Sequence, residues 1–232
     1  YMPGSVTAAD LSARPFRITV EQEALETRAL ILANGAAARM LGLPEEDQLI
    51  GHGLSTCATC DGFFYRGKKI VVVGGGDSAM EESTFLTKFA DEVTLIHRRE
   101  QFRASRIMLD RARHNPKIKF LLDTVVERIH DPAQGTVTGV KLKNVKTGRE
   151  SDFATDGLFL AIGHVPNTSV FHSQIAMDGE GYVTTSEYVR TSVDGVFAAG
   201  DVQDRIYRQA VSAAGSGCMA AMAAEKWLEA QH

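Results

Sequence analysis

Short apolar runs that end in glycine, asparagine or charged residues recur along the whole chain. Runs of this length, bounded by turn residues, are typical of buried strands. We predict strands at residues 16–20, 29–33, 69–73, 93–96, 118–122, 124–129, 137–142, 157–162 and 195–201. The pattern is sharpest at residues 69–73, because this apolar run leads directly into three consecutive glycines.

Apolar side chains at helical spacing predict three helices between or after these strands. Residues 80–90 carry Phe85, Leu86 and Phe89 on one face, and residues 105–114 form the second predicted helix. From residue 209 onward Ala, Gly and Met dominate, and Trp227 and Leu228 lie on a predicted terminal helix. The sequence contains no solenoid repeat and no low-complexity linker.

Length and charge narrow the range of functions. A chain of 232 residues is long enough for one large or two small domains with a buried core. A formal net charge of −4 argues against nucleic-acid binding, which favours a strongly basic surface. The apolar runs are much shorter than the roughly 20 residues of a membrane span. We therefore expect a soluble, cytoplasmic protein with neither a nucleic-acid nor a membrane partner.

The three glycines carry a dinucleotide-binding pattern. Gly74-x-Gly76-x-x-Ala79 follows a predicted strand and opens a predicted helix, which is the context that this fingerprint requires. Gly74 allows a tight turn, Gly76 lets the backbone approach a pyrophosphate, and Ala79 permits close contact between helix and strand. We predict that Gly74, Gly76, Asp77, Ser78 and Ala79 bind the cofactor. A simple tight turn between strand and helix is the alternative interpretation.

Basic residues at the end of the next strand indicate which nucleotide is bound. An NAD site has an acidic residue there for the ribose 2′-hydroxyl, whereas this chain has His97, Arg98 and Arg99, followed by Arg103. Guanidinium groups form bidentate, charge-assisted hydrogen bonds with a phosphate. The four residues therefore favour NADPH over NADH, and the alternative is a solvated basic face.

Two of the three cysteines, Cys57 and Cys60, form a C-x-x-C pair. In an α/β protein such a pair is more often redox-active than structural, because the motif lowers the pKa of one thiol. Asp61 is placed to deliver or accept the proton of thiol–disulfide exchange. The alternatives are a structural disulfide or two buried thiols. We expect no metal site, because no second pair has zinc-ligand spacing, and we assign no role to Cys218.

These motifs, in their order and spacing, resemble the low-molecular-weight thioredoxin reductases. The stretches that carry the resemblance are CATCDGFFY from Cys57, VGGGDSA from Val73, HRREQFR from His97, AIGHVPN from Ala161 and FAAGDV from Phe197. The resemblance implies an α/β fold in which a Rossmann-like NADPH-binding domain, a parallel sheet with a β-meander, is inserted into an FAD-binding domain of the same type. We expect the NADPH domain at residues 40–163 and parts of the FAD domain at residues 1–39 and 164–232.

The resemblance also assigns roles to individual residues. Cys60 would face the flavin and form the charge-transfer thiolate, Cys57 would attack the disulfide of thioredoxin, and Asp61 would act as the acid. Asp201 would hydrogen-bond the ribityl chain of FAD, and Arg208, Gln209 and Ala210 would meet its ring system. The remaining cofactor-binding residues that we expect are Asn34, Gly35, Ile162, Gly163 and Gly200.

The resemblance further implies a homodimer that reduces thioredoxin with electrons from NADPH. The family's first glycine motif, for the ADP half of FAD, has no counterpart ahead of Phe16. We therefore expect the chain to be part of a longer enzyme. Two other functions stay open at this point: a related NADPH–flavin reductase for another protein disulfide, as in peroxiredoxin systems, and a non-catalytic NADP-binding fragment.

Overall fold

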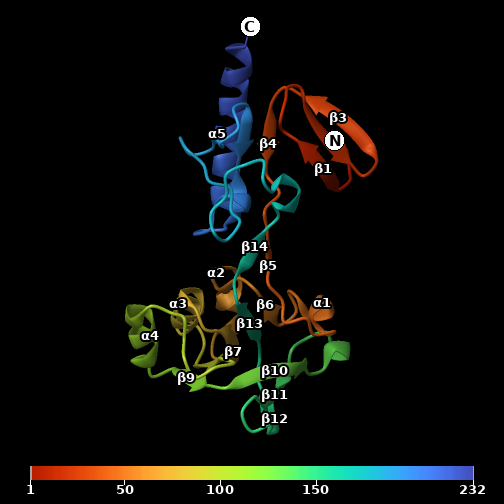
Figure 1. The fold of residues 1–232 in the computed structure, drawn as a ribbon. Coiled ribbons are helices and arrows are strands. Elements are labelled where there is room, and N and C mark those ends of the chain that lie inside the picture. Colours follow the sequence, from red (N-terminus) through yellow and green to blue (C-terminus); the bar gives the residue numbers. More distant parts are fainter. Residues whose placement is uncertain (1, 232) are drawn as a thin grey trace. The chain divides into compact units, whose positions relative to one another are not determined.

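A computed structural model describes residues 2–231, which divide into two compact units (Figure 1). Unit 1 combines the two ends of the chain, up to Ala37 and from His164 onward, and unit 2 is the intervening segment Ala38–Gly163. The chain therefore leaves unit 1 once and returns to it once, at β5 (Ala36–Ala38) and β14 (His164–Pro166), which pair with each other.

A parallel sheet of five strands forms the centre of unit 2. Its order is β6 (Leu54–Ser55), β13 (Leu158–Ala161), β7 (Lys69–Gly74), β8 (Glu92–Ile96) and β9 (Ile118–Leu121). Every residue of β13 is buried, as are most residues of β7 and β8. Burial on both faces explains why these strands read as continuous apolar runs rather than as alternating patterns.

Different elements cover the two faces of this sheet. Helices α3 (Asp77–Leu86) and α4 (Arg106–Arg113) share a core with one set of strand side chains, in which Met80 and Leu86 join Ile70 and Val72. The antiparallel strands β10 (Thr124–Ile129), β11 (Gly139–Asn144) and β12 (Glu150–Ala154) share a second core with the other set. Helix α1 (Glu46–Leu49) adds Leu49 to this second core, and the short helix η2 (Pro132–Gln134) lies on the connection between β10 and β11.

Unit 1 is built from a meander, a pair of parallel strands and one long helix. The antiparallel meander consists of β1 (Val6–Asp10), β2 (Phe16–Val20) and β3 (Glu23–Thr27). The parallel pair is β4 (Leu30–Leu32) with β15 (Val196–Ala198), followed by η4 (Gly200–Val202). The helix is α5 (Ala210–Glu229), and η3 (Ser169–Phe171) lies on the connecting segment.

The parallel pair of unit 1 contributes to two cores. Leu32 and Val196 pack with Phe16 of the meander, whereas Phe197 packs with Trp227 of α5. Gly195, with φ +81°, lies against the indole, and a Cβ there would be 2.9 Å from the ring. Asp194 accepts a hydrogen bond of 2.8 Å from the indole Nε1. The C-terminal helix α5 is therefore held against the turn that leads into β15.

The apolar pattern predicted the longer buried strands and missed exposed strands and very short ones. The predicted strands and helices are confirmed, although α3 begins at Asp77 instead of residue 80 and ends at Leu86 instead of residue 90. The strand predicted at residues 195–201 is limited to Val196–Ala198, because Gly200, with φ +70°, starts a turn. Strands β1, β3 and β12 escaped prediction, since most of their side chains are exposed, and so did β5, β6 and β14, which are only two or three residues long. No helix in residues 2–231 is both long enough and apolar enough to cross a membrane.

Candidate active site

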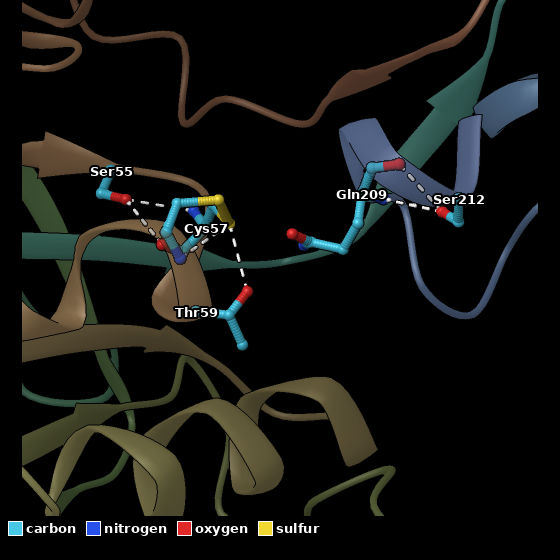
Figure 2. The surroundings of a disulfide bond; sticks show 6 residues. Ser55, Cys57, Thr59, Gln209 and Ser212 are labelled. Carbon is cyan, nitrogen blue, oxygen red and sulfur yellow. Dashed lines mark hydrogen bonds between the residues drawn. A yellow bond between two sulfur atoms is a disulfide. The ribbon is translucent and has the colours of Figure 1, made fainter. Parts of the chain in front are cut away.

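Cys57 and Cys60 form a disulfide at the start of the short helix α2 (Ala58–Asp61) (Figure 2). Cys57 is the N-cap, and its Sγ accepts a hydrogen bond of 3.2 Å from the backbone N–H of Cys60. The hydroxyl of Thr59 lies 3.4 Å from the same sulfur, which in the disulfide can only accept. Two hydrogen-bond donors are therefore directed at Cys57 Sγ, which favours a thiolate on this residue after reduction.

Ser55, the last residue of β6, fixes the backbone that precedes the helix. Its side chain is 3% exposed, and its Oγ accepts the N–H of Cys57 at 3.1 Å (Figure 2). Asp61 ends α2, where its N–H donates to the carbonyl of Cys57 at 3.1 Å. The pKa of Tyr65 is raised, first by burial and then by the negative charge of Asp61. The Asp61 carboxylate therefore lies close enough to influence the phenol of Tyr65. The structure therefore brings Cys57, Cys60 and Asp61 together, as predicted.

An exposed aromatic surface adjoins the disulfide. Helix α2 continues into η1 (Gly62–Tyr65), which carries Phe63 at 58% and Phe64 at 68% exposure. The Phe63 ring meets Phe89 edge to face at 6.3 Å and lies under the guanidinium of Arg66 at 4.6 Å. We call Phe63, Phe64, Phe89 and Arg66 the aromatic surface. Adjacent phenylalanines beside a C-x-x-C were the available sequence signal, and we gave them no role.

The glycine-rich turn between β7 and α3 has the geometry of a nucleotide site. A Cβ on Gly74 would be 2.4 Å from the carbonyl oxygen of Ala161 and 2.6 Å from Ala79 Cβ, so this position requires glycine. Gly76 is the N-cap of α3 and makes no side-chain cap, while a Cβ added there would meet nothing within 4 Å. No N-cap side chain therefore occupies the start of α3, as a phosphate-binding helix requires.

The segment 97–105, which we call the arginine loop, is attached to this turn. The carbonyl of Gly75 accepts the N–H groups of Arg103 at 2.8 Å and Ala104 at 3.2 Å. His97, 8% exposed, lies so close to Gly75 that a Cβ there would be 2.1 Å from its ring. The His97 ring also stacks on Phe102, with centroids 4.8 Å apart. His97 thus has a structural role in the loop.

The arginine side chains of this loop are available for a phosphate. Arg98, Arg99 and Arg103 are exposed, and no carboxylate within residues 2–231 forms an ion pair with them. They lie on the loop that is hydrogen-bonded to the glycine-rich turn. Uncapped helix N–H groups and nearby unpaired guanidiniums are the donor set that a pyrophosphate and a 2′-phosphate need. The residues present therefore fit NADPH.

Ile162 and Gly163 follow β13, the strand that lies beside β7. Ala161 pairs with Gly74, so the two residues continue the chain past the glycine-rich turn. Gly163 has φ +96°, a conformation that favours glycine. Their predicted contact with the cofactor stays a prediction. Ser78 is exposed and Ala79 buried at the start of α3, which matches a solvent-facing and a packing role respectively.

The residues predicted to bind the flavin gather in unit 1. Asn34 and Gly35 follow β4, and Gly200 and Asp201 follow the parallel strand β15, so both pairs lie at the carboxyl ends of adjacent strands. Ligands of parallel α/β sheets bind at this edge. Asn34 is exposed, and burial and then the Asp204 carboxylate raise the pKa of Asp201. The donor and acceptor groups at this edge fit FAD.

Arg208, Gln209 and Ala210 lead into α5 in the same unit. Asp204 accepts the N–H groups of Ile206 and Tyr207, each at 2.9 Å, and the N–H of Arg208 at 3.3 Å. Gln209 caps the helix through a reciprocal pair of hydrogen bonds with Ser212, shown in part in Figure 2. These contacts fix the backbone at the start of α5 without any ligand.

One face of α5 is apolar and open. It borders a groove of about 630 Å³ beside β4, lined by Ile31, Ala221, Met222, Ala224, Glu225, Leu228 and Glu229. Ile31 is 38% and Met222 52% exposed, and the free Cys218 lies exposed on the same helix. Among the described residues, no group of three His, Cys, Asp or Glu side chains is placed to hold a metal ion.

Comparison with known proteins places this arrangement in a family. The model of the pyridine nucleotide-disulphide oxidoreductases matches residues 1–217. The chain belongs to this family. A thioredoxin reductase of Mycolicibacterium smegmatis is 56% identical over 228 residues, which cover 97% of this chain and 72% of that protein.

Solved structures agree with this family assignment. The thioredoxin reductase of Streptococcus pyogenes is 39% identical with a TM-score of 0.91, covering 98% of this chain and 74% of that one. The thioredoxin reductase of Giardia duodenalis is 43% identical with a TM-score of 0.90, covering 98% and 75%. The expected resemblance, the α/β fold class, the disulfide oxidoreductase activity and the use of FAD and NADPH are thereby confirmed.

Proposed function

We propose that this oxidoreductase passes electrons from NADPH through FAD and the Cys57–Cys60 disulfide to thioredoxin. The observation that carries the proposal is a disulfide at a helix N-terminus, in the same unit as an open glycine-rich turn and an unpaired arginine loop. The names of the relatives support thioredoxin as the substrate over another protein disulfide or a non-catalytic fragment.

The nucleotide site binds and orients the reductant. The first N–H groups of α3 take the pyrophosphate, and Arg98, Arg99 and Arg103 take the 2′-phosphate. Bound FAD would supply the two-electron chemistry that links the hydride of NADPH to the disulfide. Asn34, Gly35, Gly200, Asp201 and the segment 208–210 would hold that cofactor in unit 1.

Thiol–disulfide exchange then transfers the electrons onward. Two electrons break the Cys57–Cys60 bond and leave two sulfurs, of which Cys57 Sγ is stabilised as a thiolate by Cys60 N–H and the Thr59 hydroxyl. This thiolate attacks one sulfur of the substrate disulfide, and the departing thiolate takes a proton, supplied by Asp61. Cys60 then attacks Cys57, which releases the reduced substrate and re-forms the disulfide.

The aromatic surface supports a protein as the substrate. Two adjacent phenylalanines that are more than half exposed are unusual on a soluble surface unless a partner covers them. Aromatic side chains and arginine are also the residues that contribute most to protein–protein binding. We assign this surface to the binding of thioredoxin next to the disulfide that reduces it. A cytoplasmic homodimer completes the proposal, in line with the family resemblance.

The visible absorption spectrum of the purified protein, recorded before and after addition of NADPH, tests this function. We expect a flavin band that bleaches on addition of NADPH and recovers on addition of oxidised thioredoxin. Cys57→Ser is the matched control, because it should retain bleaching by NADPH and lose recovery by thioredoxin. A band that bleaches in the native protein but does not recover with thioredoxin would exclude thioredoxin as the substrate.

A further inference from the structure

A carboxylate stands where the nucleotide phosphates are expected. Asp77 is the first residue of α3, directly after the N-cap Gly76, and its side chain is exposed. A negative charge next to a pyrophosphate repels it, so a phosphate site gains nothing from a carboxylate as a ligand. Some other task must therefore account for Asp77 at this position.

The structure shows what Asp77 contacts. Its Oδ1 accepts a hydrogen bond of 2.7 Å from the backbone N–H of Ser105, which is the N-cap of α4. The Ser105 hydroxyl makes no capping hydrogen bond to α4. The contact thus joins a side chain at the start of α3 to the backbone at the start of α4, 28 residues further along the chain.

The bridge from Asp77 to Ser105 closes the arginine loop. This loop leaves β8 at His97 and ends at Ser105, and Arg98, Arg99 and Arg103 lie between these two points. The other attachments of the loop to the glycine-rich turn, from the Gly75 carbonyl and the His97 ring, involve backbone or buried groups. Glu100 of the loop also forms an exposed ion pair of 3.0 Å with Lys146, which ties the loop to the segment after β11 and not to the turn. Asp77 is therefore the attachment to the turn and α3 that an exposed side chain makes, and it can be removed without disturbing the core.

We propose that Asp77 is a positioning residue for cofactor selectivity and not a cofactor ligand. By holding Ser105, it keeps the arginine loop at the distance from the glycine-rich turn that separates a 2′-phosphate from a pyrophosphate. Selectivity for NADPH over NADH thus depends on a residue that touches neither phosphate. This inference rests on the proposed NADPH site and adds to it the contact that aligns its two halves.

Binding of two half-cofactors to the flavin-loaded enzyme tests the proposal, with titration calorimetry as a readout independent of turnover. Adenosine 2′,5′-bisphosphate carries the 2′-phosphate and 5′-AMP lacks it, so the Kd of 5′-AMP divided by the Kd of the bisphosphate reports on the arginine loop alone. In Asp77→Ala this ratio should fall about fivefold, since a hydrogen bond to a charged acceptor is lost at an exposed position. Asp77→Asn retains an acceptor oxygen and should keep the native ratio.

Changes at Ser105 provide matched controls from the donor side. Ser105→Ala keeps the N–H and should leave the ratio unchanged. Ser105→Pro removes the N–H at a φ of −58°, which proline can adopt, and should reproduce the effect of Asp77→Ala. The double variant Asp77→Ala with Ser105→Pro should lose no more than either single change, because both remove the same hydrogen bond.

The results separate this inference from the function on which it rests. If the native enzyme binds both half-cofactors equally, the NADPH assignment itself is wrong. If it prefers the bisphosphate but Asp77→Ala weakens both probes alike, Asp77 does not set selectivity. If Asp77→Asn also loses the preference, the charge and not the hydrogen bond is responsible, and the positioning role is overturned. The ratio of KM for NADH to KM for NADPH should follow the same order among the variants.

Discussion

Helices α3 and α5 both begin at a predicted cofactor site, one in each unit, yet their N-termini are capped differently. The N-cap of α3 is Gly76, which has no side chain, whereas α5 starts with a reciprocal capping box between Gln209 and Ser212. A capping box satisfies N–H groups that a phosphate would otherwise bind. From this comparison we expect α3 to supply hydrogen-bond donors to its ligand, and α5 to act on its ligand mainly through the positive end of its dipole.

The largest effect on stability and NADPH binding should come from replacing one of two adjacent glycines before α3, Gly75, by alanine. A Cβ on Gly75 would lie 2.1 to 2.8 Å from three atoms of the buried His97 ring. Gly75→Ala should therefore lower the free energy of unfolding by about 2 kcal/mol and abolish NADPH binding. Gly76→Ala, with no protein atom in the way, should leave stability almost unchanged and weaken NADPH alone.

Urea unfolding and NADPH titration of both variants distinguish the two positions. The two glycines are adjacent, but a Cβ would meet the His97 ring at Gly75 and open space at Gly76. Equal losses of stability would mean that the arginine loop does not press on Gly75. Unchanged NADPH affinity in Gly76→Ala would mean that no ligand occupies the space before α3.

Arg98→Ala should weaken NADPH binding next most strongly. A hydrogen bond to a charged group contributes about 1.5–3 kcal/mol to binding, so its loss should raise the Kd for NADPH roughly tenfold to hundredfold. NADH has no 2′-phosphate, so its Kd should hardly change. Fluorescence titration with both nucleotides measures the effect, and Arg106→Ala, on the neighbouring helix α4, is the control. A parallel loss for NADPH and NADH would show that Arg98 does not contact the 2′-phosphate.

Removal of one exposed ring tests whether the aromatic surface serves the substrate. Phe64→Ala should raise KM for thioredoxin about tenfold, as expected for an exposed aromatic anchor. The rate with a small aromatic disulfide should stay unchanged, because that substrate needs only access to Cys57. Steady-state kinetics with the two substrates gives the answer. An equal effect on both would mean that the ring supports the disulfide helix instead of a partner.

The parts of the site that depend on neighbouring residues could be predicted from the sequence, and those that depend on contacts distant along the chain could not. Gly74, Gly76 and the pair Cys57 and Cys60 were predictable, since a tight turn and a helical spacing are local properties of a few residues. The contact between Asp77 and Ser105 could not be predicted, because every residue except proline has a backbone N–H and the sequence does not reveal which one Asp77 accepts. His97 was predicted as a ligand, while its contact with Gly75 depends on two strands that pair in space.

The fold shows the same division between local and distant causes. Continuous apolar runs identified β7, β8 and β13, which are buried on both faces. Strand β12, with the sequence ESDFA, has one half-buried phenylalanine and is held by pairing with β11. No pattern within its own five residues distinguishes it from a polar loop. Its partner strand, which is not encoded locally, decides its conformation.

The smallest expected effect concerns His164, at the point where the chain re-enters unit 1. Burial and then the charge of Arg208 lower the pKa of this imidazole below 6.5, and its Nδ1 is buried without a hydrogen-bond partner among the described residues. The unfolded chain therefore takes up this proton at a higher pH than the folded one. The stability that neutral His164 contributes is fully present above about pH 6.5 and decreases as the pH falls below that value.

Trp227 makes this change measurable in unit 1 alone, because it is the single tryptophan of the chain and lies in the core of that unit. We expect urea midpoints from its fluorescence to fall between about pH 7 and pH 5.5, and to fall less in His164→Gln, which cannot be protonated. His114→Gln, in unit 2, should keep the native slope. If all three proteins lose stability equally with acid, the slope arises from carboxylates elsewhere, and the buried imidazole is not a source of pH sensitivity in unit 1.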